Sequence, residues 1–229
     1  MTEHPRCCGA SYVKVEQNNN KRSITMMQLY TNPQSRGNTI LPFLKELNIE
    51  DQVELINISY EDLQQASYLA LNPMAKVPCL VDGDSIITEV PAIIAYLADK
   101  YIEQDFAPAL NDPKRGTYLT WLFFIHGPLT EYMDVKSLDV AASVIETKKR
   151  SLSFGDEQRV FQFLKRGLNQ ANPYLLGEKC TAADLYLAYW LVYAMVFKLI
   201  PYFEEAKPFL TRMKSRASVQ GIAWFDAIE

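Results

Sequence analysis

The chain has 229 residues, of which 48% are hydrophobic and 22% charged, and its net charge is −4 at pH 7. This length and apolar content suffice for one or two domains with sizeable cores. The acidic balance disfavours nucleic acid as a partner, and no apolar run approaches the roughly 20 residues that cross a bilayer. With no secretory pattern in the first residues either, we expect a soluble cytoplasmic protein of two domains, without a membrane partner.

The first segment, residues 1–25, is polar and buries little, so we predict a disordered tail. The cysteines show no metal-ligand spacing, and two adjacent cysteines in a polar tail make a poor disulfide framework. We therefore expect free thiols and no metal site. The residues concerned are Cys7, Cys8, Cys79 and Cys180.

The next segment has the pattern of a βαβ unit, with a strand over 26–31, a helix over 35–47, a strand over 52–58 and a helical crossover over 60–71. Pro42 falls inside the first helix, where it either kinks the helix or marks its effective first turn.

The most informative stretch is 71–97. Pro78 heads the apolar strand 79–81, where a missing N–H is tolerated. A cis bond before Pro78 would leave the backbone of Val77 free to pair with a peptide-like ligand, which then docks as an extra strand. Residues 82–85 have turn chemistry, and a second strand follows at 86–87.

A helix begins directly after this hairpin, with Thr88 or Glu89 at the N-cap. Free N–H groups at a helix start can bind a carboxylate, and Glu89 can pair with an ammonium group. The alternative role for Glu89 is to complement the helix dipole.

No convincing strand follows Tyr101, and Asp112-Pro113 opens a long helical stretch. Thr181 and Asp184 have capping-box spacing, with aspartate in place of the usual glutamate or glutamine. They predict the start of a buried helix over 185–196. Residues 112–229 are therefore expected to form an all-helical domain.

Together the two motifs resemble the glutathione transferase family over 26–218. The resemblance implies an α/β plus all-α architecture, with a thioredoxin-like domain at 26–102 and the helical domain after it. Ala75 stands where the family usually has glycine, and Val90 where it usually has serine. The matching residues are Asn72-Pro73, Lys76-Val77-Pro78, Glu89, Ala92-Ile93, Gly177, Thr181 and Ala183-Asp184-Leu185.

The resemblance implies glutathione as co-substrate and a hydroxyl donor that stabilises its thiolate near a helix N-terminus. The suitably placed loop is 30–37, and Ser35 is our first choice as this catalytic donor. Asn32 and Thr31 remain candidates, whereas Tyr30 is expected to point into the core. Ser35 also fits an ordinary helix N-cap.

The glutathione-binding residues implied by the resemblance are Asn32, Lys76, Val77, Pro78, Glu89 and Val90. Lys76 is placed to meet the glycyl carboxylate or to be solvated. The hydroxyl missing at Val90 weakens binding by roughly 0.5–1.5 kcal/mol, while its backbone N–H remains available.

For the electrophile pocket, Phe123, His126 and Thr130 share helical spacing. The bland interpretation of such a stripe is core packing. The step Gly127-Pro128 is expected to bend the helix.

The function implied is an enzyme that conjugates the glutathione thiolate to small hydrophobic electrophiles in detoxification, as a homodimer. Disulfide reduction is disfavoured, since no cysteine lies in 30–37. Two alternatives stay open: a glutathione-dependent isomerase, dehalogenase or peroxidase on the same fold, and a non-catalytic interaction module.

Overall fold

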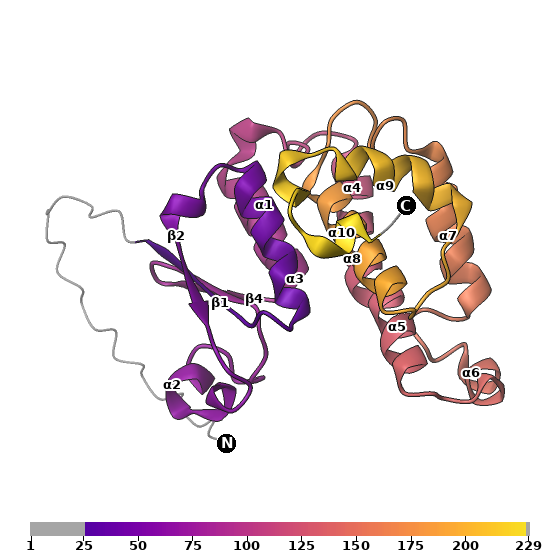
Figure 1. Ribbon diagram of the computed structural model, residues 1–229, viewed down its shortest axis with the longest axis horizontal. Coiled ribbons are helices and arrows are strands. Elements are labelled where there is room, and N and C mark those ends of the chain that lie inside the picture. Colours follow the sequence, from indigo (N-terminus) through magenta and orange to yellow (C-terminus); the bar gives the residue numbers. More distant parts are fainter. Residues whose placement is uncertain (1–25, 228–229) are drawn as a thin grey trace, which may run out of the picture.

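The computed structural model describes residues 26–227, so the predicted tail, with Cys7 and Cys8, lies outside the described residues. The chain forms an α/β unit and a helical unit, with α1 and α3 lying between the sheet and the helical unit (Figure 1). The sheet has the order β2-β1-β3-β4. Its strands are β1 (Met27–Thr31), β2 (Val53–Asn57), β3 (Cys79–Asp82) and β4 (Ser85–Thr88).

Strand β1 runs parallel to β2 and antiparallel to β3, and β3 pairs antiparallel with β4. Because side chains alternate along a strand, Leu29 and Leu80 join the main core, which also contains residues of α1 (Ile40–Glu46) and α3 (Val90–Lys100). Tyr30 belongs to a smaller core with Cys79, where its ring lies 5.7 Å from that of Tyr68. The mixed sheet confirms the predicted thioredoxin-like unit.

The first predicted helix is divided in two. Residues Arg36–Thr39 form a 3₁₀ turn, and the α-helix begins only at Ile40. Pro42 therefore lies in the first turn of α1, where its missing N–H costs no intrahelical bond. Of the two effects expected of Pro42, the marking of the first turn is the one observed.

The helical crossover predicted over 60–71 is largely wrong. It contains a 3₁₀ turn, Asp62–Gln64, and the single turn of α2 (Ala66–Leu69). Ser59 binds Asp62 through its hydroxyl, and Gln65 is extended (φ −70°, ψ 144°). Such local side-chain bonds compete with a continuous helix.

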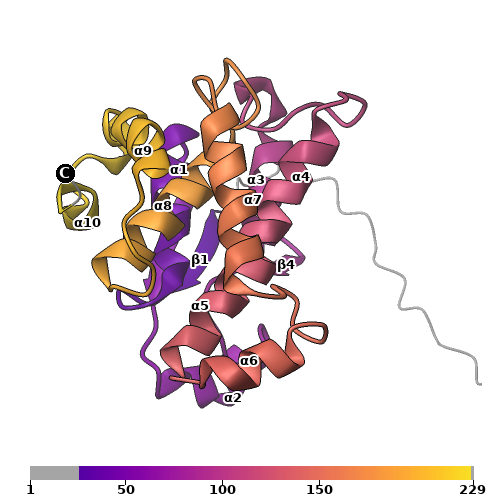
Figure 2. The same cartoon turned by 90° about the vertical axis from the view of Figure 1, so that its right-hand side faces the viewer.

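The all-helical prediction for the second unit is confirmed. Helix α8 is its centre, is buried on nearly all sides and packs against α4, α9 and α10; Figure 2 views this unit from the side of α7. A π-helical turn, Ile125–Leu129, joins α4 to α5 at the predicted bend. The helices are α4 (Arg115–Phe124), α5 (Thr130–Ser137), α6 (Ala142–Lys148), α7 (Glu157–Gln170), α8 (Ala182–Val196), α9 (Lys207–Lys214) and α10 (Ala223–Asp226).

The capping box at the start of α8 is confirmed. Asp184 is fully buried, and its carboxylate accepts hydrogen bonds from Thr181 N (2.8 Å), Thr181 Oγ1 (2.7 Å) and Leu175 N (2.8 Å). Burial raises the pKa of Asp184, while these donors favour its charged form. The helix begins at Ala182, earlier than predicted, because Thr181 itself is the N-cap.

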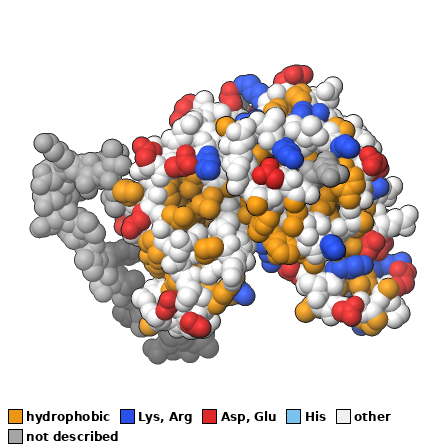
Figure 3. All heavy atoms as spheres, in the orientation of Figure 1, with side chains coloured by type: hydrophobic (Ala, Val, Ile, Leu, Met, Phe, Trp, Pro, Cys, Tyr) orange, Lys and Arg blue, Asp and Glu red, His pale blue; other side chains and the backbone are white. Residues whose placement is uncertain are grey.

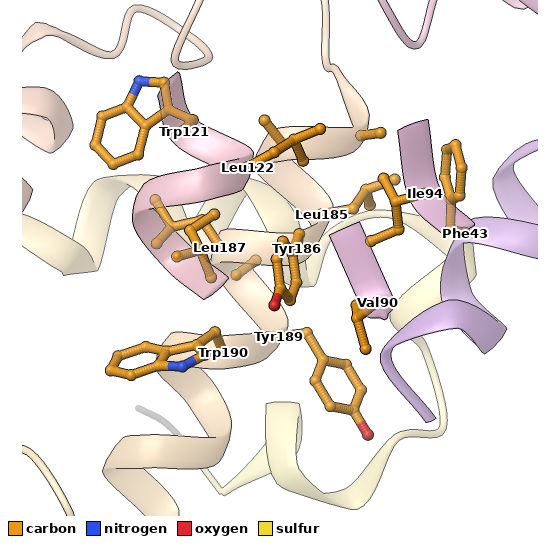
Figure 4. Packing of buried hydrophobic residues seen from close by; sticks show 14 of the residues in the cluster. Phe43, Val90, Ile94, Trp121, Leu122, Leu185, Tyr186, Leu187, Tyr189 and Trp190 are labelled. Atoms are coloured by element: carbon orange, nitrogen blue, oxygen red, sulfur yellow. The ribbon is translucent and has the colours of Figure 1, made fainter. Parts of the chain in front are cut away.

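Two kinds of contact join the units. The main core runs through both, as Phe43, Ile94, Leu122 and Leu185 show in Figure 4. At its edge Arg216 forms a bidentate ion pair with Glu46 of α1, with both N–O distances 2.6 Å. The pair raises the pKa of Arg216. Because the guanidinium binds both carboxylate oxygens, the pair fixes the orientation of the two side chains as well as the distance between them.

Removing the Asp184 carboxylate should destabilise the protein strongly. In Asp184→Ala the N–H groups of Leu175 and Thr181 lose their acceptor, and buried unsatisfied donors cost roughly 1–3 kcal/mol each. We expect a loss of about 2–4 kcal/mol, seen as a melting temperature lower by roughly 5–15 °C in a thermal unfolding scan.

Asp156→Ala is the matched control, because Asp156 caps α7 through a bond to Arg159 N but is only partly buried. Its loss should cost about 1 kcal/mol. Equal losses in the two variants would contradict the special role of burial at Asp184.

Candidate active site

A cavity of about 260 Å³ lies between the two units, where Figure 3 shows the surface hollowed between their lower lobes. One wall comes from the α/β unit and the other from the helical unit. The first wall contains Arg36, Gly37, Thr39, Asn72, Lys76, Val77, Pro78, Glu89 and Val90, and the second His126, Thr130, Tyr186, Tyr189, Trp190 and Tyr193.

The Val77-Pro78 peptide bond is cis. The loop before it is held at the carbonyl of Lys76, which accepts hydrogen bonds from Asn72 Nδ2 (2.8 Å) and the Tyr68 hydroxyl. Val77 precedes the first paired residue of β3, and its backbone makes no hydrogen bond to another described residue. Its peptide groups are therefore available to a ligand in the cavity.

The same loop contains a strained alanine. Ala75 has φ 52°, in the left-handed region, which costs a residue with a Cβ roughly 1–2 kcal/mol. Its N–H donates to the carbonyl of Asn72 (3.0 Å), which fixes this conformation. A glycine would adopt this conformation without strain.

Glu89, not Thr88, is the N-cap of α3, with φ 71° and no side-chain capping bond. The first N–H groups of α3 thus remain free for an anion at the cavity. The Glu89 carboxylate is 56% exposed, and its Oε2 lies 3.3 Å from Nε2 of His126 on the opposite wall. The predicted glutathione residues of this turn, Glu89 and Val90, both line the cavity.

Ser35 takes the capping role that was its alternative interpretation. Its hydroxyl donates to Asn32 O (2.8 Å) and accepts from Gly37 N (3.1 Å). It lies behind Gly37, where an added Cβ would come 3.0 Å from Ser35 Oγ and 3.3 Å from Pro78 Cβ. Gly37 lines the cavity and Ser35 does not.

The two other candidates in this loop are structural. Asn32 donates from Nδ2 to Ile58 O (2.9 Å) and accepts from Gln34 N (2.9 Å), and it borders a separate depression. Thr31 is fully buried, and its hydroxyl donates to Asn38 Oδ1 (3.3 Å). These local bonds hold both side chains away from the cavity.

Of the predicted electrophile residues, His126 and Thr130 line the cavity, but Phe123 is 65% exposed and lies outside it. The prediction for Phe123 used regular α-helical spacing across the bend expected at Gly127-Pro128. The π-helical turn after Phe124 has more residues per turn, so the three side chains no longer share one face.

Sequence reasoning missed the aromatic wall of α8. Tyr186, Tyr189, Trp190 and Tyr193 face the cavity from successive turns, and their spacing of three, four and seven residues was the available signal. Burial raises the pKa of Tyr186 and Tyr189, so both hydroxyls stay protonated. Arg36 also lines the cavity and pairs with Asp134 at 3.2 Å.

The described cysteines, Cys79 and Cys180, are free thiols, as predicted. Cys79 is fully buried, and burial raises its pKa to about 11. Too little thiolate forms at neutral pH for Cys79 to act as a nucleophile.

Comparison with known proteins shows the family to which the chain belongs. Residues 38–100 match the model described as the N-terminal domain of glutathione S-transferase, and residues 117–218 match its C-terminal domain. The chain belongs to the glutathione S-transferase family. No helix among residues 26–227 is long and apolar enough to span a membrane.

Individual relatives are distant. Glutathione S-transferase 1 of Schizosaccharomyces pombe is 29% identical over 161 residues, which cover 66% of this chain and 68% of the relative. The glutathione transferase of Methylococcus capsulatus is 26% identical with a TM-score of 0.71, covering 88% of this chain and 98% of the other. A family member from Pseudomonas fluorescens, solved with two glutathione molecules bound, is 25% identical with a TM-score of 0.66, covering 90% and 94%.

Replacing Ala75 by glycine should stabilise the protein, because glycine relieves the left-handed strain at φ 52°. The greater entropy of glycine in the unfolded chain offsets part of this relief. We therefore expect a net increase of roughly 0.5–1 kcal/mol in the free energy of unfolding, measured by denaturant titration.

Ala70→Gly is the control in the same segment, because Ala70 has ordinary helical angles (φ −67°, ψ −27°). It should lose about 0.5–1 kcal/mol. If both variants lose stability, Ala75 is not strained as argued.

Proposed function

We propose that this protein is an enzyme that conjugates the thiolate of glutathione to small hydrophobic electrophiles, as a homodimer in the cytoplasm. The observation that carries the proposal is the cavity between the units, which joins a wall of unpaired backbone groups to an aromatic wall. The first suits a tripeptide, and the second an apolar co-substrate.

The α/β wall offers a partner for each polar end of glutathione. The peptide groups of the ligand pair with the backbone of Val77, as an added strand. The free N–H groups at the start of α3 take the γ-glutamyl carboxylate. Glu89 binds the ammonium group, and Lys76 lies in the same wall for the glycyl carboxylate.

Thiol activation is assigned to the turn that begins α1. Lowering the thiol pKa by two units needs about 2.7 kcal/mol of preference for the thiolate. The N-terminus of the 36–39 turn supplies positive potential. Ser35 caps this turn from outside the cavity, behind Gly37; its proposed role as donor requires that its hydroxyl turn from the carbonyl of Asn32 towards the sulfur when glutathione binds.

An ultraviolet difference titration of the protein with reduced glutathione across pH tests this proposal. A saturable thiolate signal with its midpoint well below the free thiol pKa of about 8.5 is expected. In Ser35→Ala the midpoint should rise by about one unit and turnover fall roughly tenfold, as one hydrogen bond to a charged group is lost.

Ser59→Ala is the matched control. The Ser59 hydroxyl, like that of Ser35, accepts a hydrogen bond from a backbone N–H a few residues later in the chain, that of Asp62 (3.1 Å), and Ser59 lies outside the cavity. It should lose stability without changing the thiol pKa. A wild-type protein that gives no signal at high glutathione would instead indicate the non-catalytic interaction module.

Glu89→Gln should weaken glutathione binding. The variant keeps the size of the side chain and removes the charge that faces the ammonium group. Because this carboxylate is 56% exposed, we expect a modest rise in Kd of roughly three- to tenfold, within the range for a hydrogen bond to a charged group in partial solvent. Isothermal titration calorimetry measures it.

Glu103→Gln removes an exposed carboxylate that does not line the cavity and serves as the control. Its Kd should match the wild type. Unchanged binding in Glu89→Gln would remove Glu89 from the ligand site.

A further inference from the structure

One ionisable pair bridges the cavity from the α/β wall to the helical wall. Glu89 lies at the start of α3, His126 lies in the π-helical turn between α4 and α5, and Glu89 Oε2 is 3.3 Å from His126 Nε2. Neither side chain forms another hydrogen bond or ion pair with a residue in 26–227. The carboxylate that we assign to the ammonium group of glutathione therefore already has a partner whenever the imidazole is charged.

The helical end of this bridge is held in place by α8. The turn Ile125–Leu129 carries His126, and the carbonyl of Ile125 accepts a hydrogen bond from the Thr130 hydroxyl (2.7 Å). Trp190 of α8 in turn donates from Nε1 to the same hydroxyl oxygen (3.1 Å). Because these bonds tie the turn to the buried helix, the imidazole lies opposite the start of α3.

The other end of the bridge can change its partner. The Glu89 side chain makes no capping bond to its own helix and is 56% exposed, and the side chain of His126 is 39% exposed. Rotation about side-chain bonds is enough to move such a carboxylate from one cation to another. A ligand ammonium group in the cavity can therefore take the place of the imidazole without a change in the backbone.

The other ionisable groups that line the cavity are arginine, lysine and tyrosine. Arg36 and Lys76 lie on the α/β wall, where Arg36 pairs with Asp134 of α5 (3.2 Å), and α8 contributes tyrosine hydroxyls. Side chains of these types ordinarily keep their charge between about pH 5.5 and pH 8, whereas an imidazole gains a proton in this interval. His126 is the only histidine among residues 26–227, and the other histidine of the chain is His4.

We propose that His126 is a positioning residue for Glu89 and makes the binding of glutathione depend on the proton of its imidazole. This inference rests on the proposed function, in which Glu89 binds the ammonium group of glutathione. The protonated imidazole holds the carboxylate across the cavity and competes with the ammonium group, and the neutral imidazole does not. The affinity for glutathione is therefore highest with the imidazole neutral, and it falls as the pH is lowered and the imidazole gains its proton.

The experiment measures the Kd of S-methylglutathione by isothermal titration calorimetry at about pH 5.5 and about pH 8, at one ionic strength. This ligand keeps the ammonium group and both carboxylates but has no ionisable thiol, so thiol activation does not contribute to the difference. In the wild type we expect Kd to be roughly two- to fivefold higher at the lower pH, the range for an exposed ion pair. In His126→Gln the ratio of the two Kd values should fall to about one.

His4→Gln is the matched control, because it removes the other histidine of the chain, which lies outside the described residues. It should keep the wild-type ratio. Glu89→Gln should bring the ratio close to one although His126 is present, and adding His126→Gln to that variant should not change the ratio further. This coupling of the two substitutions is a result that a merely structural role of His126 does not give.

A wild-type Kd that is equal at the two pH values would overturn the proposal, as would a full ratio that persists in His126→Gln or in Glu89→Gln. Tighter binding at the lower pH would also overturn it, because the imidazolium would then attract a carboxylate of the ligand instead of competing for Glu89. If S-methylglutathione fails to bind at either pH, the proposed function itself is wrong.

Discussion

The buried carboxylate of Asp184 is the interaction on which the arrangement of the helical unit depends. It closes the first turn of α8 and holds the segment before it through Leu175. Helix α8 is buried along most of its length and packs against α4 and α9 and against α1 and α3 of the α/β unit. Because this same helix also carries the aromatic wall, the bond network at its start sets where that wall lies.

The cavity exists only because the two units are fixed against each other. The shared core supplies most of the contact, and burial of apolar area is not directional. The bidentate pair of Arg216 with Glu46 fixes the orientation of one unit relative to the other, because both oxygens of the carboxylate are bound. Its side chains are mostly shielded from water (22% and 11% exposed). The distance between the α/β wall and the aromatic wall is therefore set by the way the two units pack against each other.

Two of the residues with strained backbone lie at the α/β wall. Ala75 and Glu89, on either side of the β3–β4 hairpin, both have left-handed φ values of 52° and 71°. Each costs free energy that a relaxed loop would avoid, and surrounding bonds such as that from Asn72 to the Lys76 carbonyl hold the loop in place. The result is a wall with backbone groups left unpaired, ready for a ligand that can satisfy them.

The sequence by itself determined the division into two units, the hairpin after Pro78, a helix start at Thr88 or Glu89 and the capping box at Thr181, because each depends on residues close together in the chain. The crossover helix failed where local bonds at Ser59 outweighed periodicity. Only the tertiary structure decided which side chains face the cavity. Ser35 is turned to its own backbone, and a π-helical turn moves Phe123 off the cavity face. Helix α8 is apolar on every side, so the spacing of its aromatic residues shows that they share a face but not that this face meets the cavity. Packing between segments far apart in the chain decides which side chains face the cavity. The residue pattern along the chain does not show that packing.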